Sequence, residues 1–364
     1  MQLQERELAL QPVEPNLAPG EKYAAKSRKF QGIPTIERAP GGRLWAAYYS
    51  GGDGEGPDNY VVLVHSGDDG RTWSVPWLVI DPPGKVRAFD PCLWIDPLGR
   101  LWLCWAQSFE MYDGRCGVWA SLLDDPDEPD GIWSAPRRIA NGIMMNKPTV
   151  LRSGEWLFPT AVWAVQWAIR LSGMDSLPEE RFSNVYVSTD QGESFALRGQ
   201  ANVPNRFFDE HMIVEHEDES LRMLVRTTYG IGESHSTDKG LTWSRGKPTR
   251  LGGPNSRFYI RRLRSGRLLL VNHYGFNGRS HLTAQVSEDD GMTWTEGLLL
   301  DERENVSYPD GTEAADGTIY IIYDRERKLD MDILMAVFKE EDVLAGRCVT
   351  PGARLKVAVD KGGA

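Results

Sequence analysis

The stretch SGDDGRTW at residues 66–73 follows the pattern S-x-D-x-G-x-T-W, of which the chain holds four copies, one of them with Ser-Phe in place of Thr-Trp. The other copies are STDQGESF (188–195), STDKGLTW (236–243) and SEDDGMTW (287–294). The last three copies start 48 residues apart (188 to 236) and 51 residues apart (236 to 287). Repeats of this length are typical of propellers, in which each repeat forms one blade. The Asp and Gly positions predict a turn, and the Thr-Trp pair predicts the start of the next strand.

A second repeat predicts the number of blades. Six apolar segments, each opened by a turn, are expected as the second strands of their blades. They are residues 41–49, 98–106, 153–161, 219–227, 265–273 and 316–324. The segments ahead of them, expected as innermost strands, are residues 32–37, 90–95, 146–151, 210–215, 256–263 and 308–314. Six such units predict an all-β, six-bladed β-propeller that uses residues 1–364 as one domain.

Two blades depart from the repeat. Blade 2 has a degenerate turn, DDPDEPDGIW (124–133), and blade 6 lacks the motif after residues 333–343. One short turn of helix is expected near residues 339–346. The fourth strand of blade 6 is expected from a terminus, either residues 3–10 or residues 353–360.

Composition narrows the function classes. The 37 Gly, 22 Pro and 13 Trp fit an all-β protein rich in turns and large aromatic side chains. The net charge of −11 disfavours nucleic acid as a partner. The chain has no run of about 18 apolar residues, so no membrane association is expected. The start, MQLQERELAL, lacks the apolar core of a signal peptide, which favours a cytoplasmic location unless a leader has been removed.

The cysteine pattern predicts no metal site. The four cysteines have no metal-ligand spacing, and free thiols are expected at Cys92, Cys104, Cys116 and Cys348. No pair of histidines has a spacing diagnostic of a metal either, so neither a metal nor a cofactor is predicted. The oligomeric state is not indicated by the sequence.

The residues that open the innermost strands are unusually polar. Inner strands of a propeller converge on the central axis, so their first residues ring one mouth of the channel. Converging charged groups favour a binding or catalytic site there, against the alternative that each one caps a strand. These residues are Asp90, Asn146, Lys147, Glu210, His211, Arg257 and Tyr308.

The repeated turn resembles the Asp box of sialidases, and several site positions extend the resemblance along the chain. Glu210 precedes Arg226 by 16 residues and resembles the Glu and second Arg of that family. Arg279, ahead of the last Asp box, resembles the third Arg. Tyr308, in NVSYPDG, lies 29 residues further on and resembles the nucleophilic Tyr that opens blade 6.

The expected acid/base residue lies in a glycine-rich loop of blade 1. Asp53, in GGDGEGPDN, lies 13 residues ahead of the first Asp box and resembles the acid/base Asp of sialidases. Asp is also a common turn residue in such loops, so Asp53 could serve the turn alone. Asp58 in the same loop is the alternative acid.

The resemblance implies an exo-acting, retaining glycoside hydrolase that acts on a terminal acidic sugar such as sialic acid. A phenol has an unperturbed pKa of about 10 and needs a base, so Glu210 would take the proton of Tyr308. Asp53 would protonate the leaving oxygen and then deprotonate water. Arg226 and Arg279 would hold the negative group of the sugar.

One position departs from the family pattern. The family opens blade 1 with aromatic-Arg-Ile-Pro, whereas this chain has FQGIP (30–34), with Gly32 at the Arg position. That Arg belongs to a triad that binds the carboxylate of the substrate. Either another cation, Arg87 or Lys147, takes its place, or a glycosidase or lyase acts on another glycan, such as one containing a uronic acid or a deoxy-sugar. A non-catalytic carbohydrate-binding propeller is the third hypothesis.

Overall fold

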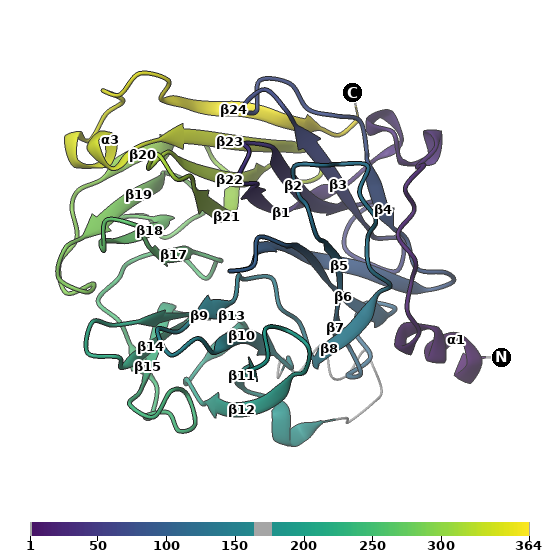
Figure 1. The fold of residues 1–364 in the computed structure, drawn as a ribbon, viewed down its shortest axis with the longest axis horizontal. Helices are drawn as coiled ribbons and strands as arrows, with labels where there is room; N and C mark the ends of the chain where they lie inside the picture. The colour runs from purple at the N-terminus through teal and green to yellow at the C-terminus, as the bar shows by residue number, and fades with distance from the viewer. Residues whose placement is uncertain (1, 164–176, 364) are drawn as a thin grey trace.

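Six four-stranded antiparallel sheets form a ring in the computed structural model, which describes residues 2–163 and 177–363 (Figure 1). Within each sheet the strands follow one another in chain order from the central axis to the outer edge. The predicted six-bladed β-propeller is therefore confirmed.

The blades share one layout, so their strands are grouped by position. The innermost strands are β1 (Gln31–Arg38), β5 (Val86–Ile95), β9 (Thr149–Val150), β13 (Arg206–Glu215), β17 (Tyr259–Arg262) and β21 (Val306–Glu313). The second strands are β2 (Leu44–Ser50), β6 (Leu101–Phe109), β10 (Trp156–Ala161), β14 (Leu221–Thr227), β18 (Leu268–His273) and β22 (Ile319–Arg325). The third strands are β3 (Tyr60–Ser66), β7 (Gly117–Leu123), β11 (Ser183–Ser188), β15 (Gly230–Ser236), β19 (Leu282–Ser287) and β23 (Asp332–Phe338). The outer strands are β4 (Leu78–Ile80), β8 (Arg137–Asn141), β12 (Ala196–Ala201), β16 (Lys247–Pro248), β20 (Leu298–Asp301) and β24 (Arg354–Lys361).

Each of the four Asp boxes connects the third and fourth strands of its blade. In the first box, the Asp68 carboxylate accepts hydrogen bonds from the Thr72 hydroxyl (2.6 Å), the Thr72 amide (2.9 Å) and the Ser66 hydroxyl (2.8 Å). These bonds favour the charged carboxylate and lower the pKa of Asp68 to about 2. The local side chains therefore fix the turn, as the motif predicts.

The C-terminal segment supplies the fourth strand of the sixth blade, since β24 pairs with β23 (Figure 1). The alternative, a strand at residues 3–10, is wrong. This segment forms α1 (Gln2–Glu7) and the 3-10 helix η1 (Leu8–Leu10), and the expected helical turn near residues 339–346 is α3 (Glu340–Ala345).

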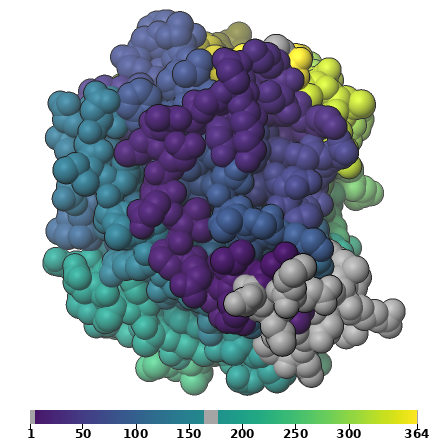
Figure 2. Space-filling model, turned by 90° about the vertical axis from the view of Figure 1, so that its right-hand side faces the viewer, coloured from purple at the N-terminus to yellow at the C-terminus, as the bar shows by residue number. Residues whose placement is uncertain are grey.

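The N-terminal segment runs along the outside of the ring (Figure 2). It includes the 3-10 helices η2 (Glu21–Tyr23) and η3 (Ala25–Ser27), and a fourth, η4 (Pro178–Glu180), precedes β11. At its end the buried Arg28 pairs with Asp360 of β24 at 2.7 Å. The segment therefore contacts the last blade just before it enters the first.

Side chains of the innermost strands close the ring between the first and sixth blades. The Thr35 hydroxyl of β1 donates to Asp310 of β21 at 2.7 Å. The backbone amide of Ile33 donates to Asp324 of β22 at 2.8 Å. Both carboxylates are buried, so each joins residues that lie far apart in the sequence.

Two further observations concern the helices and the cysteines. Among the helices of the described residues, none has the length and apolarity that a membrane crossing requires. The four cysteines are free, and Cys348 is the exposed one.

Candidate functional site

Four innermost strands carry β-bulges toward the same end of the ring. The pairing register shifts within residues 32–35 of β1, 89–92 of β5, 206–212 of β13 and 307–310 of β21. Each bulge contains a non-glycine residue with positive φ, and these include Ile33 (55°), Asp90 (47°), Glu210 (41°) and Tyr308 (57°). Such conformations cost about 1–3 kcal/mol each and cluster at functional sites. Bulges also re-aim side chains, so the backbone itself marks this mouth as the candidate site.

Tyr308, Glu210 and Arg226 form one buried hydrogen-bonded cluster. The Tyr308 hydroxyl donates to Glu210 Oε1 at 2.7 Å, which is the contact expected from the sequence. Nη1 of Arg226 lies 2.6 Å from the same Oε1 and 2.8 Å from the phenolic oxygen. The three residues are 6%, 7% and 3% exposed, respectively. On its other edge Arg226 donates from Nε to the side chain of Asn255 at 2.6 Å, so its guanidinium is fixed in place.

Burial and the neighbouring charges have opposite effects on the pKa of the Tyr308 phenol. Burial raises the pKa of Tyr308 to about 12, and Glu210 adds to the rise. Arg226, Arg279 and Arg327 lower the pKa, because each favours the phenolate. Oε2 of Glu210 is buried and has no hydrogen-bond partner among the described residues, so this carboxylate keeps a free acceptor. The arrangement can move the phenolic proton to Glu210 and hold the resulting charge between arginines.

Three guanidinium groups surround Tyr308. Arg226 comes from β14, and Arg279, which precedes β19, places Cζ 5.3 Å from the Tyr308 ring centroid. Arg327 follows β22 and places Cζ 4.3 Å from the same centroid. The sequence analysis identified Arg226 and Arg279 but missed Arg327. Arg327 lies in a loop, DRERKLD, where neither a repeat nor a motif distinguishes it.

The structure does not bring Lys147, one of the two candidates for the missing cation, to the Tyr308 cluster. Its Nζ lies 2.9 Å from Glu37 Oε1 and 3.2 Å from Asp310 Oδ2, inside the ring. It also donates to the backbone carbonyls of Ile36 and Leu93 at 2.8 and 2.5 Å. Its charge is therefore neutralised by the interior, and Lys147 stabilises the fold instead.

Arg257 belongs to the same interior network and does not reach a ligand surface. It donates from Nε to Asn146 at 2.7 Å and pairs with Asp310 at 3.3 Å, and it is fully buried. Asn146 in turn donates to the backbone carbonyl of Glu210 at 2.8 Å. These two residues therefore support the strand that carries Glu210.

His211 is also an interior residue. Its Nε2 lies 2.8 Å from the backbone carbonyl of Asn184, and the ring is buried. Burial lowers the pKa of His211 to about 4, so the imidazole is neutral at neutral pH. It supports the fold and does not contribute a charge to the mouth.

Arg87 and Asp90 lie in the bulged part of β5. The Arg87 guanidinium packs over the Phe89 ring at 3.5 Å and is buried. Burial raises the pKa of Asp90 to about 8, whereas Arg87 lowers it and Glu55 and Glu210 raise it. Asp90 is thus close enough to the charged groups of the mouth to interact with them, and its burial favours the neutral acid.

The structure also corrects the placement of Asp53. Its side chain is 86% exposed and pairs with Lys29 at 3.0 Å, outside the Tyr308 cluster. The alternative, Asp58, is exposed as well. Glu55 of the same loop comes nearer, with Oε1 3.6 Å from Nη1 of Arg327. The sequence identified the loop, but a run with four glycines between residues 51 and 56 does not fix which carboxylate approaches Arg327.

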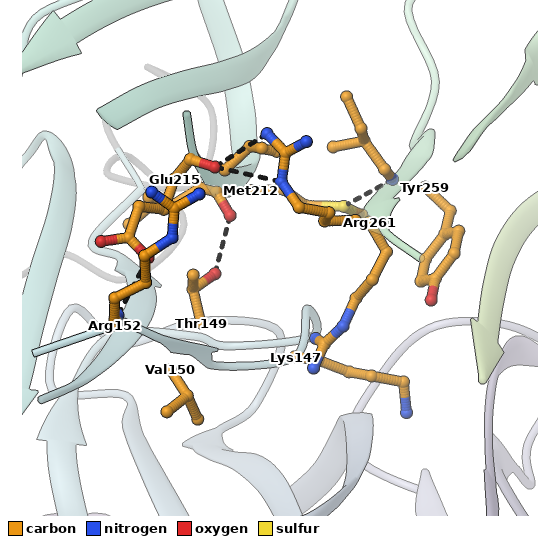
Figure 3. Close-up of a pocket in the computed structure, with 12 residues that line it drawn as sticks. Lys147, Thr149, Val150, Arg152, Met212, Glu215, Tyr259 and Arg261 are labelled. Atoms are coloured by element: carbon orange, nitrogen blue, oxygen red, sulfur yellow. Dashed lines mark hydrogen bonds between the residues drawn. The ribbon is translucent and has the colours of Figure 1, made fainter. Parts of the chain in front are cut away.

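A separate cavity of about 300 Å³ lies at the other end of the innermost strands (Figure 3). Figure 3 shows Lys147 and Arg261 on one side of it and Arg152 and Thr149 on the other. The Tyr308 cluster does not line this cavity. Within residues 2–163 and 177–363, no group of three or more His, Cys, Asp or Glu side chains is placed to hold a metal ion.

Comparisons with known proteins agree with this architecture. Residues 42–321 match the family described as BNR repeat-like domain. A search of curated proteins found no match. Among solved structures, the Hadza microbial sialidase Hz136 has a TM-score of 0.67 at 20% identity, covering 86% of this chain and 66% of that one. The chain therefore spans about two thirds of that sialidase.

Two further structures match over most of their length. The intramolecular trans-sialidase from Ruminococcus gnavus, solved in complex with oseltamivir carboxylate, has a TM-score of 0.64 at 14% identity and covers 92% of this chain and 98% of its own. A protein of unknown function from Dyadobacter fermentans has a TM-score of 0.63 at 16% identity, with coverages of 88% and 95%. At these identities the likeness establishes the fold. Because the family match spans well over half of the sequence, the chain belongs to the BNR repeat-like family, and its fold is the six-bladed propeller of sialidases.

Proposed function

We propose that the protein is an exo-acting, retaining glycoside hydrolase that uses Tyr308 as nucleophile on a terminal acidic sugar such as sialic acid. The observation that carries the proposal is the contact between the Tyr308 hydroxyl and Glu210 at 2.7 Å, with Arg226 bonded to both. Binding alone needs no buried phenol paired with a base, whereas nucleophilic catalysis by a phenol needs both. A neutral nucleophile also suits an anionic sugar, which would repel an attacking carboxylate.

The reaction would proceed in two steps through these groups. In the first step, Tyr308 Oη attacks the anomeric carbon while its proton passes to Glu210. The glycosidic bond breaks, and an acid from the loop at residues 51–59 protonates the leaving oxygen. In the second step, water attacks the anomeric carbon, and the loop carboxylate takes a proton from it. Glu210 then returns its proton to Tyr308, and the sugar leaves with retained configuration.

The loop at residues 51–59 holds three candidate acids, Asp53, Glu55 and Asp58, and the contacts of the first two differ. Asp53 is the sequence-based candidate, but its side chain pairs with Lys29. Glu55 lies at the Arg327 guanidinium, next to the Tyr308 ring. The geometry therefore favours Glu55 as the acid that reaches the leaving oxygen.

A screen with aryl glycosides tests the proposal directly. The panel contains aryl glycosides of N-acetylneuraminic acid, of glucuronic acid and of neutral sugars, and release of the aryl alcohol is measured. Proton NMR of the first-formed sugar anomer then reports whether configuration is retained. Turnover of an acidic glycoside with retention is the expected result.

The Tyr308→Phe variant tests the nucleophile, because it removes only the phenolic oxygen. We expect kcat/KM to fall by at least about 10³-fold, with the melting temperature little changed. Tyr323→Phe is the matched control: this buried Tyr donates to Asp301 at 3.0 Å, outside the cluster, and the variant should keep its activity. Full activity of Tyr308→Phe would refute the assignment. Binding of free sugars by a wild-type protein that turns over none of the panel would replace it with the non-catalytic hypothesis.

A further inference from the structure

Arg327 occupies the space that a side chain at position 32 would fill. A Cβ atom added to Gly32 would lie 2.9 Å from both Cγ and Cδ of Arg327 and 2.9 Å from Asp324 Oδ2. These contacts are closer than packed carbon atoms tolerate, and the arginine atoms are in the middle of the side chain rather than at its flexible end. Arg327 can therefore lie where it does only because residue 32 of β1 has no side chain.

A buried carboxylate holds one edge of the Arg327 guanidinium. Its Nε donates to Asp324 Oδ2 at 2.8 Å, and Nη2 donates to the Ser307 hydroxyl at 3.1 Å. Asp324 also accepts from the backbone amide of Ile33 at 2.8 Å and from the Ser307 hydroxyl at 2.6 Å. Charge-assisted bonds of this kind fix both position and orientation. Arg327 is therefore preorganised, unlike an arginine on a free loop.

The other edge of the guanidinium remains available. Nη1 of Arg327 has an ion-pair contact with Glu55 at 3.6 Å, which is too long for a hydrogen bond. The side chain is 16% exposed, and its Cζ lies over the Tyr308 ring at 4.3 Å. A ligand group beside the phenol can therefore accept hydrogen bonds from this edge.

One of the three guanidinium groups around Tyr308 has no carboxylate partner among the described residues. Arg226 pairs with Glu210, and Arg327 pairs with Asp324 and, at 3.6 Å, with Glu55. Arg279 forms no ion pair with any carboxylate in the described part of the chain, and Tyr308 is neutral. A planar carboxylate suits such a cluster, because guanidinium groups bind both of its oxygens.

We propose that Arg327 binds the carboxylate of the substrate sugar together with Arg226 and Arg279, and that Gly32 is the positioning residue that gives it room. Arg327 thereby selects glycosides whose terminal sugar carries a carboxylate. This inference rests on the proposed function for the identity of the site.

Equilibrium binding of free sugars tests the proposal without requiring turnover. The probes are N-acetylneuraminic acid and glucuronic acid, each compared with its methyl ester, which keeps the sugar and removes the charge. Calorimetry on the Arg327→Gln variant should show binding of the preferred acid weakened by about 10- to 100-fold, with ester binding nearly unchanged. Arg327→Lys, which keeps the charge beside Asp324, should lie in between and guards against misfolding of the first variant.

Arg325→Gln is the matched control. Arg325 lies two residues earlier, in β22, and its ion pairs are with Asp330 and Asp332. This variant should bind acid and ester as the wild type does. Equal weakening of acid and ester in Arg327→Gln, or no weakening at all, overturns the proposal.

A double-mutant cycle tests the link between Gly32 and Arg327. Gly32→Ala should weaken acid binding although it removes no charge, because its Cβ displaces Arg327. In an Arg327→Ala background the same change should cost nothing further, whereas independent, additive losses would overturn the link. Gly32→Arg combined with Arg327→Ala returns a cation from β1 and should recover part of the acid preference that Arg327→Ala loses.

The two proposals fail in distinguishable ways. If the wild type prefers acids through Arg327 but cleaves no glycoside, the proposed function fails and this inference stands. If it cleaves acidic glycosides and Arg327→Gln leaves the acid-to-ester preference unchanged, this inference fails and the function stands. A wild type that prefers neither acid over its ester also overturns this inference.

Discussion

The Lys147→Met substitution tests whether Lys147 stabilises the fold or binds the substrate. In the structure Nζ of Lys147 contacts Glu37 at 2.9 Å and Asp310 at 3.2 Å, and all three side chains are buried. Methionine matches the length of the lysine stem but leaves the two carboxylates without their shared partner. We therefore expect a stability defect, together with a Tyr308 cluster that is unaffected.

The magnitude follows from the cost of an unpaired buried charge. Removing one partner of a buried ion pair costs about 3–5 kcal/mol. With about 2.1 cal/mol/K of unfolding entropy per residue, 364 residues give about 0.76 kcal/mol/K. The melting temperature should therefore fall by about 4–7 °C. Asp310 keeps its bonds from Thr35 and Arg257, which places the expected loss toward the lower end of this range.

The assay compares thermal unfolding with steady-state kinetics on the best acidic substrate. Lys247→Met is the control, because Lys247 is exposed and its contact with Glu233 at 3.5 Å is a surface pair worth about 0–1 kcal/mol. Below the melting temperature, KM of Lys147→Met should equal that of the wild type. A tenfold rise in KM with an unchanged melting temperature would refute the reasoning and return Lys147 to the substrate site.

Two further changes test the loop acid and the buried histidine. Glu55→Gln should lower kcat by about 10²- to 10⁴-fold on glycosides with poor leaving groups and far less on activated aryl glycosides. Asp53→Asn and Asp58→Asn should change kcat little. A larger loss of kcat in either Asp variant than in Glu55→Gln would identify that Asp as the acid. His211, whose pKa burial lowers to about 4, contributes stability that is fully present above pH 6.5 and is lost as the pH falls toward 4, about 3 kcal/mol in total. Denaturant titrations at pH 7 and pH 5 should therefore show a smaller acid-induced loss in His211→Gln than in the wild type, and equal losses would contradict the assignment.

The fold was predictable because its signals are local. Each Asp box encodes its own turn, since Asp68 and Thr72 bond within one short segment. The main shortfall was the innermost strand expected at residues 146–151, of which only Thr149–Val150 forms β9. Pro148 lacks an amide donor and interrupts the ladder there. Asn146 and Lys147 instead use their side chains to bond the neighbouring blades.

The site residues that lie on paired strands of one blade were predictable, because their spacing in the sequence determines which of them are neighbours. Glu210 and Arg226 lie on paired strands, so their separation in the sequence places them together. Arg327 and Glu55 are loop residues, and no periodicity fixes the direction of a loop side chain. Lys147 shows a second limit. It adjoins Asn146, which supports the site, yet both residues lie ahead of β9, where no strand alternation fixes the direction of a side chain, and Lys147 contacts the interior.

The Gly32 position shows that two segments far apart in the sequence can place a cation at the same point of a closed ring. Ring closure places β1 beside β21 and β22, although Ile33 and Asp324 are 291 residues apart. A cation that β1 does not supply can therefore come from the loop after β22, because both elements border the same phenol. A comparison made position by position registers only an arginine replaced by glycine. The number of guanidinium groups that face Tyr308 depends on the closed ring rather than on any one blade, and in this chain it is three.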